Sequence, residues 1–382
     1  FGRWDDLFSL EDTKVWDDAL EFIFNQFNKD IKDFAAYLNG KGDGKLSLLP
    51  KWMPSVNTSS ANTRRLGRFF AQKFNLSEKE YRKLLAKMRS HLDIVERKMS
   101  DNNWSDIKYE GVPSRAALIY KDAFKKHDDK RYTKYIADVA AGKTKINATT
   151  LYPYDIVRQI RSGSANATHD VLWNALPNYI PQDGEYKNVL CLCDVSSSMS
   201  GLPMEVSISL GIYCGERITG PFKNHFLTFT TDSKLEKIVG NNISEKVQNL
   251  SKAEWGGSTN LQSAFNAILN AAIQNKVSQS DMPDALMIIS DMEFDVACEG
   301  YTNFEVIKSK YAASGYKLPK IIFWNVQARN DQTPITQDDK GTCLVSGCSP
   351  AVLKSVLSGK IVSPFQVMLD VLNQERYSSV VG

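Results

Sequence analysis

The sequence has few histidines and cysteines for its length: 4 His and 6 Cys occur among 382 residues. No two cysteines form a Cys-x-x-Cys pair, and no two histidines have the spacing of a zinc-protease motif, which argues against a zinc centre. The sequence also lacks any run of the roughly 20 apolar residues that a membrane-spanning helix requires. We therefore expect no membrane-embedded segment.

The usual marks of an enzyme are missing as well. The sequence has no Walker A motif and no Gly-x-Gly-x-x-Gly motif, and its histidines are scattered. Asp291 and Glu293 could be taken as a carboxylate pair for acid–base chemistry, but Asp291 has a better interpretation as a metal ligand. We expect a protein that is not an enzyme.

Cysteine usage favours a reducing environment. Cys191 and Cys193 lie in the apolar segment VLCLCDV, where a strand would place both thiols on one buried face. Buried, reduced thiols and the absence of a signal-peptide pattern at the beginning of the sequence favour an intracellular, cytoplasmic location.

Positive charge is concentrated in the middle of the sequence, although the net charge is only +3. Residues 51–161 contain 24 Lys and Arg against 12 Asp and Glu, whereas residues 1–50 contain 6 against 10 and residues 184–382 contain 17 against 20. Such a basic region is a possible nucleic-acid surface. The alternative is a set of solvated helix faces.

The first half of the sequence has helical periodicity. Apolar residues recur at spacings of three and four from Trp16 to Leu38, and Ser77 with Glu80 forms the pattern of a capping box at the start of a further helix, which we expect to continue to Met99. Two more helices are expected at about 114–127 and 131–141. We predict an all-helical domain over residues 1–183.

After residue 184 the pattern changes to apolar runs separated by helical segments. VLCLCDV, HFLTFTT, ALMIISDM and KIIFWNV have the length of strands that are buried on both faces, with helices expected at 202–219, 259–275 and 302–315. This alternation predicts a doubly wound parallel α/β domain over residues 184–382. Ligands of such folds bind at the carboxyl ends of the strands.

Oxygen-bearing side chains follow three of these segments. Asp194, Ser196 and Ser198 form an Asp-x-Ser-x-Ser loop after the first strand, Thr259 follows a Gly-rich turn in WGGSTN, and Asp291 ends another strand. Carboxylate and hydroxyl oxygens suit Mg²⁺, Mn²⁺ or Ca²⁺ rather than zinc. We predict a divalent-metal site with one coordination position open to an acidic or phosphate group of a partner. Ordinary polar loops are the alternative.

The set Asp-x-Ser-x-Ser, Thr and Asp resembles the metal-ion-dependent adhesion site (MIDAS) of von Willebrand factor A domains. By this resemblance Ser196, Ser198 and Thr259 would contact the ion, and Asp194 and Asp291 would hold it directly or through water. The order of a basic helical region and an A domain resembles the Ro autoantigen family, whose helical-repeat part is the HEAT-like TROVE module. Several segments look like those of uncharacterised Ro-like proteins: GRWDDL at 2–7, KWMPS at 51–55, RRLGRFF at 64–70, YEGVPSRA at 109–116, CDVSSSMSGLPMEVSISLG at 193–211 and IIFWN at 321–325.

The resemblance to Ro implies a ribonucleoprotein component that binds single-stranded or small structured RNA. The candidate phosphate contacts are basic residues of the middle region: Arg64, Arg65, Arg68, Lys73, Arg82, Lys83 and Lys87. Trp52, Trp104 and Tyr152 lie near basic residues and are either base-stacking platforms or core residues. The alternative function is a scaffold protein whose A-domain metal binds an acidic residue of another protein subunit.

Overall fold

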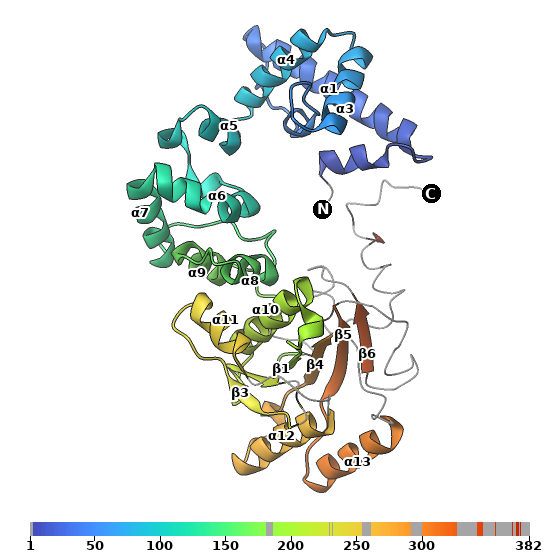
Figure 1. Cartoon of the computed structure of the whole chain (residues 1–382), viewed down its shortest axis with the longest axis vertical. Coiled ribbons are helices and arrows are strands. Elements are labelled where there is room, and N and C mark those ends of the chain that lie inside the picture. The colour runs from blue at the N-terminus through green and yellow to red at the C-terminus, as the bar shows by residue number, and fades with distance from the viewer. Residues whose placement is uncertain are drawn as a thin grey trace. The chain divides into compact units, whose positions relative to one another are not determined.

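The computed structural model describes residues 3–180, 186–228, 230, 232–253, 261–291, 300–326 and 342–346, and the single positions 356, 369, 372, 373 and 375. The chain divides into two compact units, Phe1–Lys108 and Tyr109–Gly382, shown in Figure 1. A helical region precedes an α/β region, as predicted. The described part contains no helix that is both long and apolar enough to cross a bilayer.

The regular elements of the first unit, within its described residues 3–108, are all helices. Its elements are η1 (Trp4–Leu10), α1 (Trp16–Leu38), α2 (Leu49–Trp52), α3 (Ala61–Lys73), α4 (Glu78–His91), α5 (Val95–Ser100) and η2 (Trp104–Asp106). The predicted capping box begins α4: the Ser77 hydroxyl accepts from the Glu80 amide, and the Ser77 amide donates to the Glu80 carboxylate. The helix ends earlier than predicted, because Asp93 adopts a left-handed conformation (φ 52°) that separates α4 from α5.

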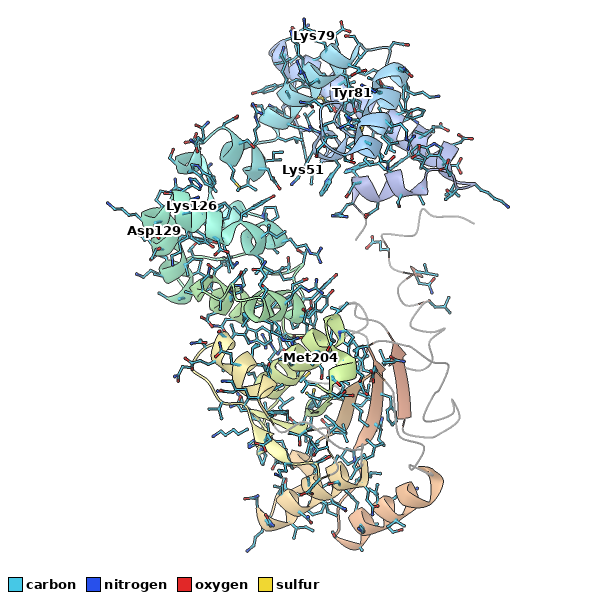
Figure 2. The ribbon with its side chains drawn as sticks, viewed as in Figure 1. Lys51, Lys79, Tyr81, Lys126, Asp129 and Met204 are labelled. Carbon is cyan, nitrogen blue, oxygen red and sulfur yellow. The ribbon has the colours of Figure 1, made fainter. Side chains whose placement is uncertain are left out.

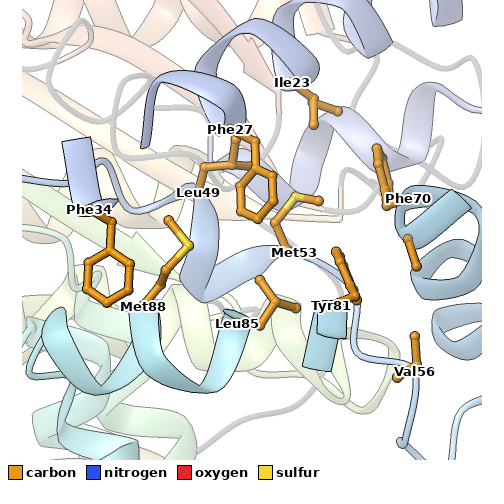
Figure 3. Close-up of a cluster of buried hydrophobic side chains, with 11 residues drawn as sticks. Ile23, Phe27, Phe34, Leu49, Met53, Val56, Phe70, Tyr81, Leu85 and Met88 are labelled. Atoms are coloured by element: carbon orange, nitrogen blue, oxygen red, sulfur yellow. The ribbon is translucent and has the colours of Figure 1, made fainter. Parts of the chain in front are cut away.

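An apolar cluster packs α1, α2, α3 and α4 against one another, with η1 beside it (Figure 3). Ile23 and Phe27 of α1 are fully buried, as are Leu49 of α2 and Tyr81 of α4. Each such side chain contributes about 1.5–3 kcal/mol by leaving water. The one buried carboxylate of α1 has hydrogen-bond partners: Asp30 accepts hydrogen bonds from the amide and the hydroxyl of Ser47, at 3.0 and 2.5 Å.

The second unit begins with a helical layer. It consists of η3 (Tyr109–Gly111), α6 (Ser114–His127), α7 (Asp129–Ala140), α8 (Pro153–Arg161) and α9 (Ala167–Asn174). The α/β part follows with β1 (Val189–Cys193), η4 (Ser197–Met199), α10 (Leu202–Arg217), β2 (His225–Thr228), β3 (Leu235–Lys237), α11 (Ile243–Ser251), α12 (Leu261–Gln274), η5 (Gln279–Asp281), β4 (Ala285–Ser290), α13 (Gly300–Ala313), β5 (Lys320–Asn325) and β6 (Thr342–Ser346).

The described strands form one sheet in the order β3-β2-β1-β4-β5-β6. All neighbours are parallel except β2 and β3, which form an antiparallel pair at one edge, so the sheet is mixed rather than purely parallel as predicted. Helices α10 and α11 contact each other, as do α12 and α13, and the two pairs lie on opposite sides of the sheet (Figure 1). Crossovers leave β1 and β4 in opposite directions, so the pair β1–β4 is the switch point at which ligands bind in such sheets.

The boundary between the units differs from the predicted one at residue 183, because the helical layer packs directly on α10. Every residue of α10 from Val206 to Gly215 is buried, as expected for a helix covered on all sides. The Trp173 indole donates to Glu216 at 2.7 Å, and the Tyr213 hydroxyl donates to the carbonyl of Pro177 at 2.6 Å. Helices α8 and α9 therefore share a core with the α/β part.

Candidate functional site

The predicted metal ligands that the structure describes lie together at the switch point of the sheet. Asp194 follows β1, and Asp291 follows β4, which pairs with β1 in parallel register. The two strand ends are joined directly: the Asp194 amide donates to the carbonyl of Ile289 at 3.0 Å. Ser196 and Ser198 lie in the loop between β1 and α10. Thr259 lies outside the described residues.

Hydrogen bonds hold this loop in position. The Ser290 hydroxyl donates to one carboxylate oxygen of Asp194 at 2.8 Å, and the Ser196 amide donates to the other at 2.9 Å. The hydroxyl oxygens of Ser196 and Ser198 are 3.0 Å apart. Ser196 is exposed and Ser198 half-buried, whereas Asp194 and Asp291 are each only 3% exposed. The set thus combines one exposed and one half-buried serine with two buried carboxylates; we call it the metal edge.

Burial of the Asp194 carboxylate carries an electrostatic cost. Burial raises the pKa of Asp194, and the charge of Asp291 adds to this effect. Carboxylates that are removed from water need a positive partner or must take up a proton. Hydroxyl and carboxylate oxygens are ligands that a hard divalent cation prefers. The residues present therefore fit the group predicted from the sequence.

The donor set is also distinct from a zinc site. Within the described part of the chain, no three His, Cys, Asp or Glu residues are grouped so that they could hold a metal. Cys191, Cys193 and Cys214 are free, buried thiols in the core of the α/β part, and burial raises the pKa of Cys193. Coordination at the metal edge would rest on two carboxylates and on hydroxyls, with solvent or a partner supplying the rest.

Three of the predicted RNA-binding residues are engaged inside the first unit. Arg64 donates to the carbonyl of Thr58 at 2.6 Å, Arg65 makes a bidentate pair with Glu11, and Arg68 pairs with Glu78 at 3.0 Å. The guanidinium of Arg65 holds the pKa of Glu11 below its ordinary value. These arginines connect α3 to the segments around it, so each would have to exchange a partner to bind a phosphate.

A second group of basic residues is available on α4. Lys79, Arg82, Lys83 and Lys87 are exposed, and none of them makes an ion pair with any residue that the structure describes. They lie on the face opposite the buried Tyr81, Leu85 and Met88; Figure 2 shows Lys79 at the surface and Tyr81 inside. We call this set the basic ridge. Lys79 was absent from the predicted set, although its spacing of four from Lys83 places it on the same stripe.

The other predicted candidates are half-buried or exposed rather than core. The Lys73 ammonium lies 5.7 Å from the Phe69 ring centroid. Trp52 lies between Arg3 and Lys51, whose charged groups are 5.1 and 5.4 Å from its ring centroid. Trp104 donates to the side-chain oxygen of Asn102. Tyr152 lies in the second unit, beside Arg115.

Two family models match this chain. A model described as domain of unknown function DUF7788 matches residues 188–378, which include the whole metal edge. A model described as domain of unknown function DUF2828 matches residues 70–176, from the end of α3 through the helical layer of the second unit. The second match crosses the boundary between the two compact units.

Individual proteins with similarity to this chain were also found. An uncharacterised protein of Acanthamoeba polyphaga mimivirus is 33% identical over 361 residues, which is 89% of this chain and 63% of the viral protein. This chain thus spans less than two thirds of that relative. The crystal structure of the Deinococcus radiodurans RO (RSR) protein superposes with a TM-score of 0.39 and 13% identity, over 80% of this chain and 69% of that one.

Proposed function

The chain belongs to the DUF7788 family through residues 188–378, and from that premise we propose that it is a non-catalytic, RNA-binding protein with a divalent-metal site for a partner. The RNA contacts the basic ridge of the first unit. The metal, Mg²⁺ or a similar ion, is held at the metal edge of the second unit by Asp194, Asp291 and the hydroxyls of Ser196 and Ser198, with Thr259 as a further expected ligand.

The observation that carries the RNA proposal is the uncompensated charge of the basic ridge. The two acidic residues of α4 are engaged elsewhere: Glu80 caps the helix with Ser77, and Glu78 pairs with Arg68. Four cations on one helix face therefore have no counter-charge among the described residues. Cations in such a row release counterions when they contact a phosphate backbone, which is the main source of sequence-independent affinity. The resemblance of several sequence segments to Ro-like proteins points to the same ligand.

This proposal predicts a specific salt dependence. Replacing Lys83 and Lys87 by Gln should lower the slope of log affinity against log salt by about 1.4 for a single strand, since each lost phosphate contact contributes about 0.7. Fluorescence anisotropy with unrelated single-stranded RNAs at several salt concentrations measures the slope, and the loss should be alike for all sequences.

A matched control is available in the same unit. Lys29 and Lys32 are exposed lysines of α1, three residues apart, and their replacement by Gln removes the same charge from another face. This variant should keep the slope of the unaltered chain. An equal decrease of the salt slope in the two variants would mean that RNA binding depends only on net charge. If the unaltered chain bound no RNA at low salt, the proposal would be refuted.

The metal edge favours a second function, in which the protein is a scaffold whose ion binds an acidic residue of another protein subunit. The supporting observation is the pair of buried carboxylates, Asp194 and Asp291, in one set with the exposed Ser196 and the half-buried Ser198, through which an ion bound there would be reached from solvent. The Asp194→Asn variant should lose Mg²⁺ or Mn²⁺ binding in calorimetric titration while circular dichroism stays unchanged. Unchanged metal affinity in that variant would show that the ligands are misassigned. Absence of any RNA binding, with metal binding retained, would favour the scaffold.

A further inference from the structure

Two tyrosines and three arginines form a surface of the second unit that neither the basic ridge nor the metal edge includes. Arg115 belongs to α6, Tyr152 precedes α8, and Tyr154, Arg158 and Arg161 lie on α8. The arginines are exposed and the tyrosines half-buried. We call these five residues the Arg–Tyr patch.

The patch is a continuous sequence of cations and aromatic rings. The Arg115 guanidinium carbon lies 5.8 Å from the Tyr152 ring centroid, and the Arg158 guanidinium carbon lies 5.5 Å from that of Tyr154. The two ring centroids are 5.4 Å apart, with their planes tilted by 45°. These distances are within the range of cation–π and ring–ring attraction. The order along the surface is therefore Arg, Tyr, Tyr, Arg.

Hydrogen bonds and ion pairs hold the patch in place. Asp155 accepts from the Tyr152 amide at 3.0 Å and lies 3.7 Å from the Arg115 guanidinium. Arg158 donates to Glu205 at 2.7 Å, which ties α8 to the first turn of α10. A side chain that is already fixed loses less conformational entropy when a ligand binds. Arg115, Arg158 and the Tyr152 backbone are thus fixed beside the two rings before a ligand binds.

One cation of the patch keeps its hydrogen-bonding capacity. Arg161 approaches the sulfur of Met204 at 2.9 Å, and sulfur is a weak acceptor. Arg161 makes no ion pair with any described residue. The guanidinium fork matches the oxygens of a phosphate in a bidentate fashion. Arg161 is therefore the position at which an anionic group of a ligand would be bound.

The patch also lies beside the metal edge along the chain. Met204 and Glu205, which contact Arg161 and Arg158, are in the first turn of α10, the helix that follows the loop containing Ser196 and Ser198. Met204 is labelled in Figure 2. A ligand on the patch would consequently lie at the N-terminal end of α10, the end that follows the loop with Ser196 and Ser198.

We propose that the Arg–Tyr patch is a stacking surface for unpaired nucleotides of RNA, with Arg161 binding an adjacent phosphate. This inference rests on the proposed RNA function and adds a second contact surface to it. An acidic peptide would need the arginines but would gain little from two neighbouring aromatic rings. Unpaired bases stack on aromatic side chains and on guanidinium planes, whereas bases in a duplex are not accessible. The patch therefore selects single strands, while the basic ridge binds phosphates of any strand.

The test uses the full chain and a single-stranded RNA that carries 2-aminopurine, whose fluorescence falls when it stacks. The double variant Tyr152→Leu, Tyr154→Leu should weaken binding by about tenfold for each stacked base and abolish the fluorescence change, without altering the salt slope. The variant Tyr152→Phe, Tyr154→Phe keeps both rings and should behave as the unaltered chain. Arg161→Gln should lower the salt slope by about 0.7.

The control is Tyr37→Leu, which removes an exposed tyrosine (43% exposed) of α1 in the first unit. This variant should change neither the RNA affinity nor the 2-aminopurine fluorescence. Thermal unfolding of each variant shows whether the fold is intact. Unchanged affinity and quenching in the Leu variant would overturn the inference but leave the ridge-based function standing. No RNA binding by the unaltered chain would refute the proposed function itself. Binding of polyglutamate that depends on both rings would assign the patch to an acidic protein and overturn the inference.

Discussion

His169 is a buried ionisable residue whose environment favours the neutral form. The side chain is 1% exposed, its Nδ1 accepts from the Asn166 amide at 3.0 Å, and its Nε2 lies 3.2 Å from the side-chain oxygen of Gln159. Burial lowers the pKa of His169 to about 4; the hydrogen bond with the Asn166 backbone and the charge of Asp122 oppose this shift, and the charge of Lys121 adds to it. The ring thus connects α9 to α8 as an uncharged group.

This environment predicts loss of stability in acid. The unfolded chain protonates this histidine near its ordinary pKa of 6.5 and the folded chain only near 4. Between these values the unfolded state binds more protons, so the free energy of unfolding rises with pH. We expect the second unit to lose on the order of 2–3 kcal/mol between pH 7 and pH 4 from this group. Urea unfolding of the chain and of His169→Gln measures it, and equal pH slopes would contradict the assignment.

The charged residues show what a sequence can and cannot predict about a site. The Asp-x-Ser-x-Ser spacing and the strand ends predicted that Asp194, Ser196, Ser198 and Asp291 belong together, because parallel strands end at one edge. The sequence did not show which basic residues have an acidic partner, so the arginines of α3 could not be distinguished from the basic residues of α4. Their partners, such as Glu11, come from segments that are distant in sequence, and only the fold shows that Arg65 is engaged and Lys83 is not.

At the scale of elements, the sequence predicted the helices and strands that have strong local patterns and missed those whose patterns are weak. The capping box and the apolar stripe predicted α1 and the start of α4, and continuous apolar runs predicted β1, β2, β4 and β5. The strand β3 was missed because two of its three residues, Glu236 and Lys237, are charged and the strand gains its order from pairing with β2. The short helix α11 was missed as well; its buried face consists of only three residues, Ile243, Val247 and Leu250.

The packing of α10 against β1 depends on a glycine, Gly211, which has no side chain. A Cβ atom at Gly211 would lie 2.5 Å from the sulfur of Cys193. The Gly211→Ala variant should therefore lose about 1–2 kcal/mol of stability, since overpacking costs about 1–3 kcal/mol and better helix propensity returns up to about 1. Chemical unfolding measures the loss.

A second substitution shows whether this contact is the cause. Adding Cys193→Ala to Gly211→Ala should recover part of the loss, and a double-mutant cycle gives the coupling. Gly111→Ala is the control, because a Cβ there meets no atom within 4 Å. Additive effects of the two core substitutions would show that another contact is responsible.

At the scale of the whole molecule, the boundary between the two compact units does not coincide with the change from helices to strands. It follows instead which elements share a hydrophobic core. The change from helical to strand periodicity near residue 183 is real, but helices α8 and α9 pack on the α/β part and complete its core. Periodicity reports local structure only. It could not show that α10, which is buried on all sides, needs α8 as a cover.

A fragment experiment tests this organisation. Residues 109–382 should fold and unfold in one cooperative transition, whereas residues 184–382 should aggregate, because one face of α10 and the ring of Tyr213 lose their cover. Size-exclusion chromatography and thermal unfolding followed by circular dichroism distinguish the two. A monomeric, cooperatively folded 184–382 fragment would show that the helical layer is dispensable.

The pairing of β1 with β4 also determines when, during synthesis of the chain, the metal edge can form. Leu190 pairs with Leu286, so the metal edge cannot exist until a segment nearly a hundred residues further along the chain has been synthesised. The first unit, by contrast, ends at Lys108. Domains at the N-terminal end fold first during synthesis, which proceeds at about 5–20 residues per second. A nascent chain on the ribosome thus presents a finished basic ridge for roughly 10–40 s before the metal edge can form, so the proposed RNA surface is complete before the proposed metal site.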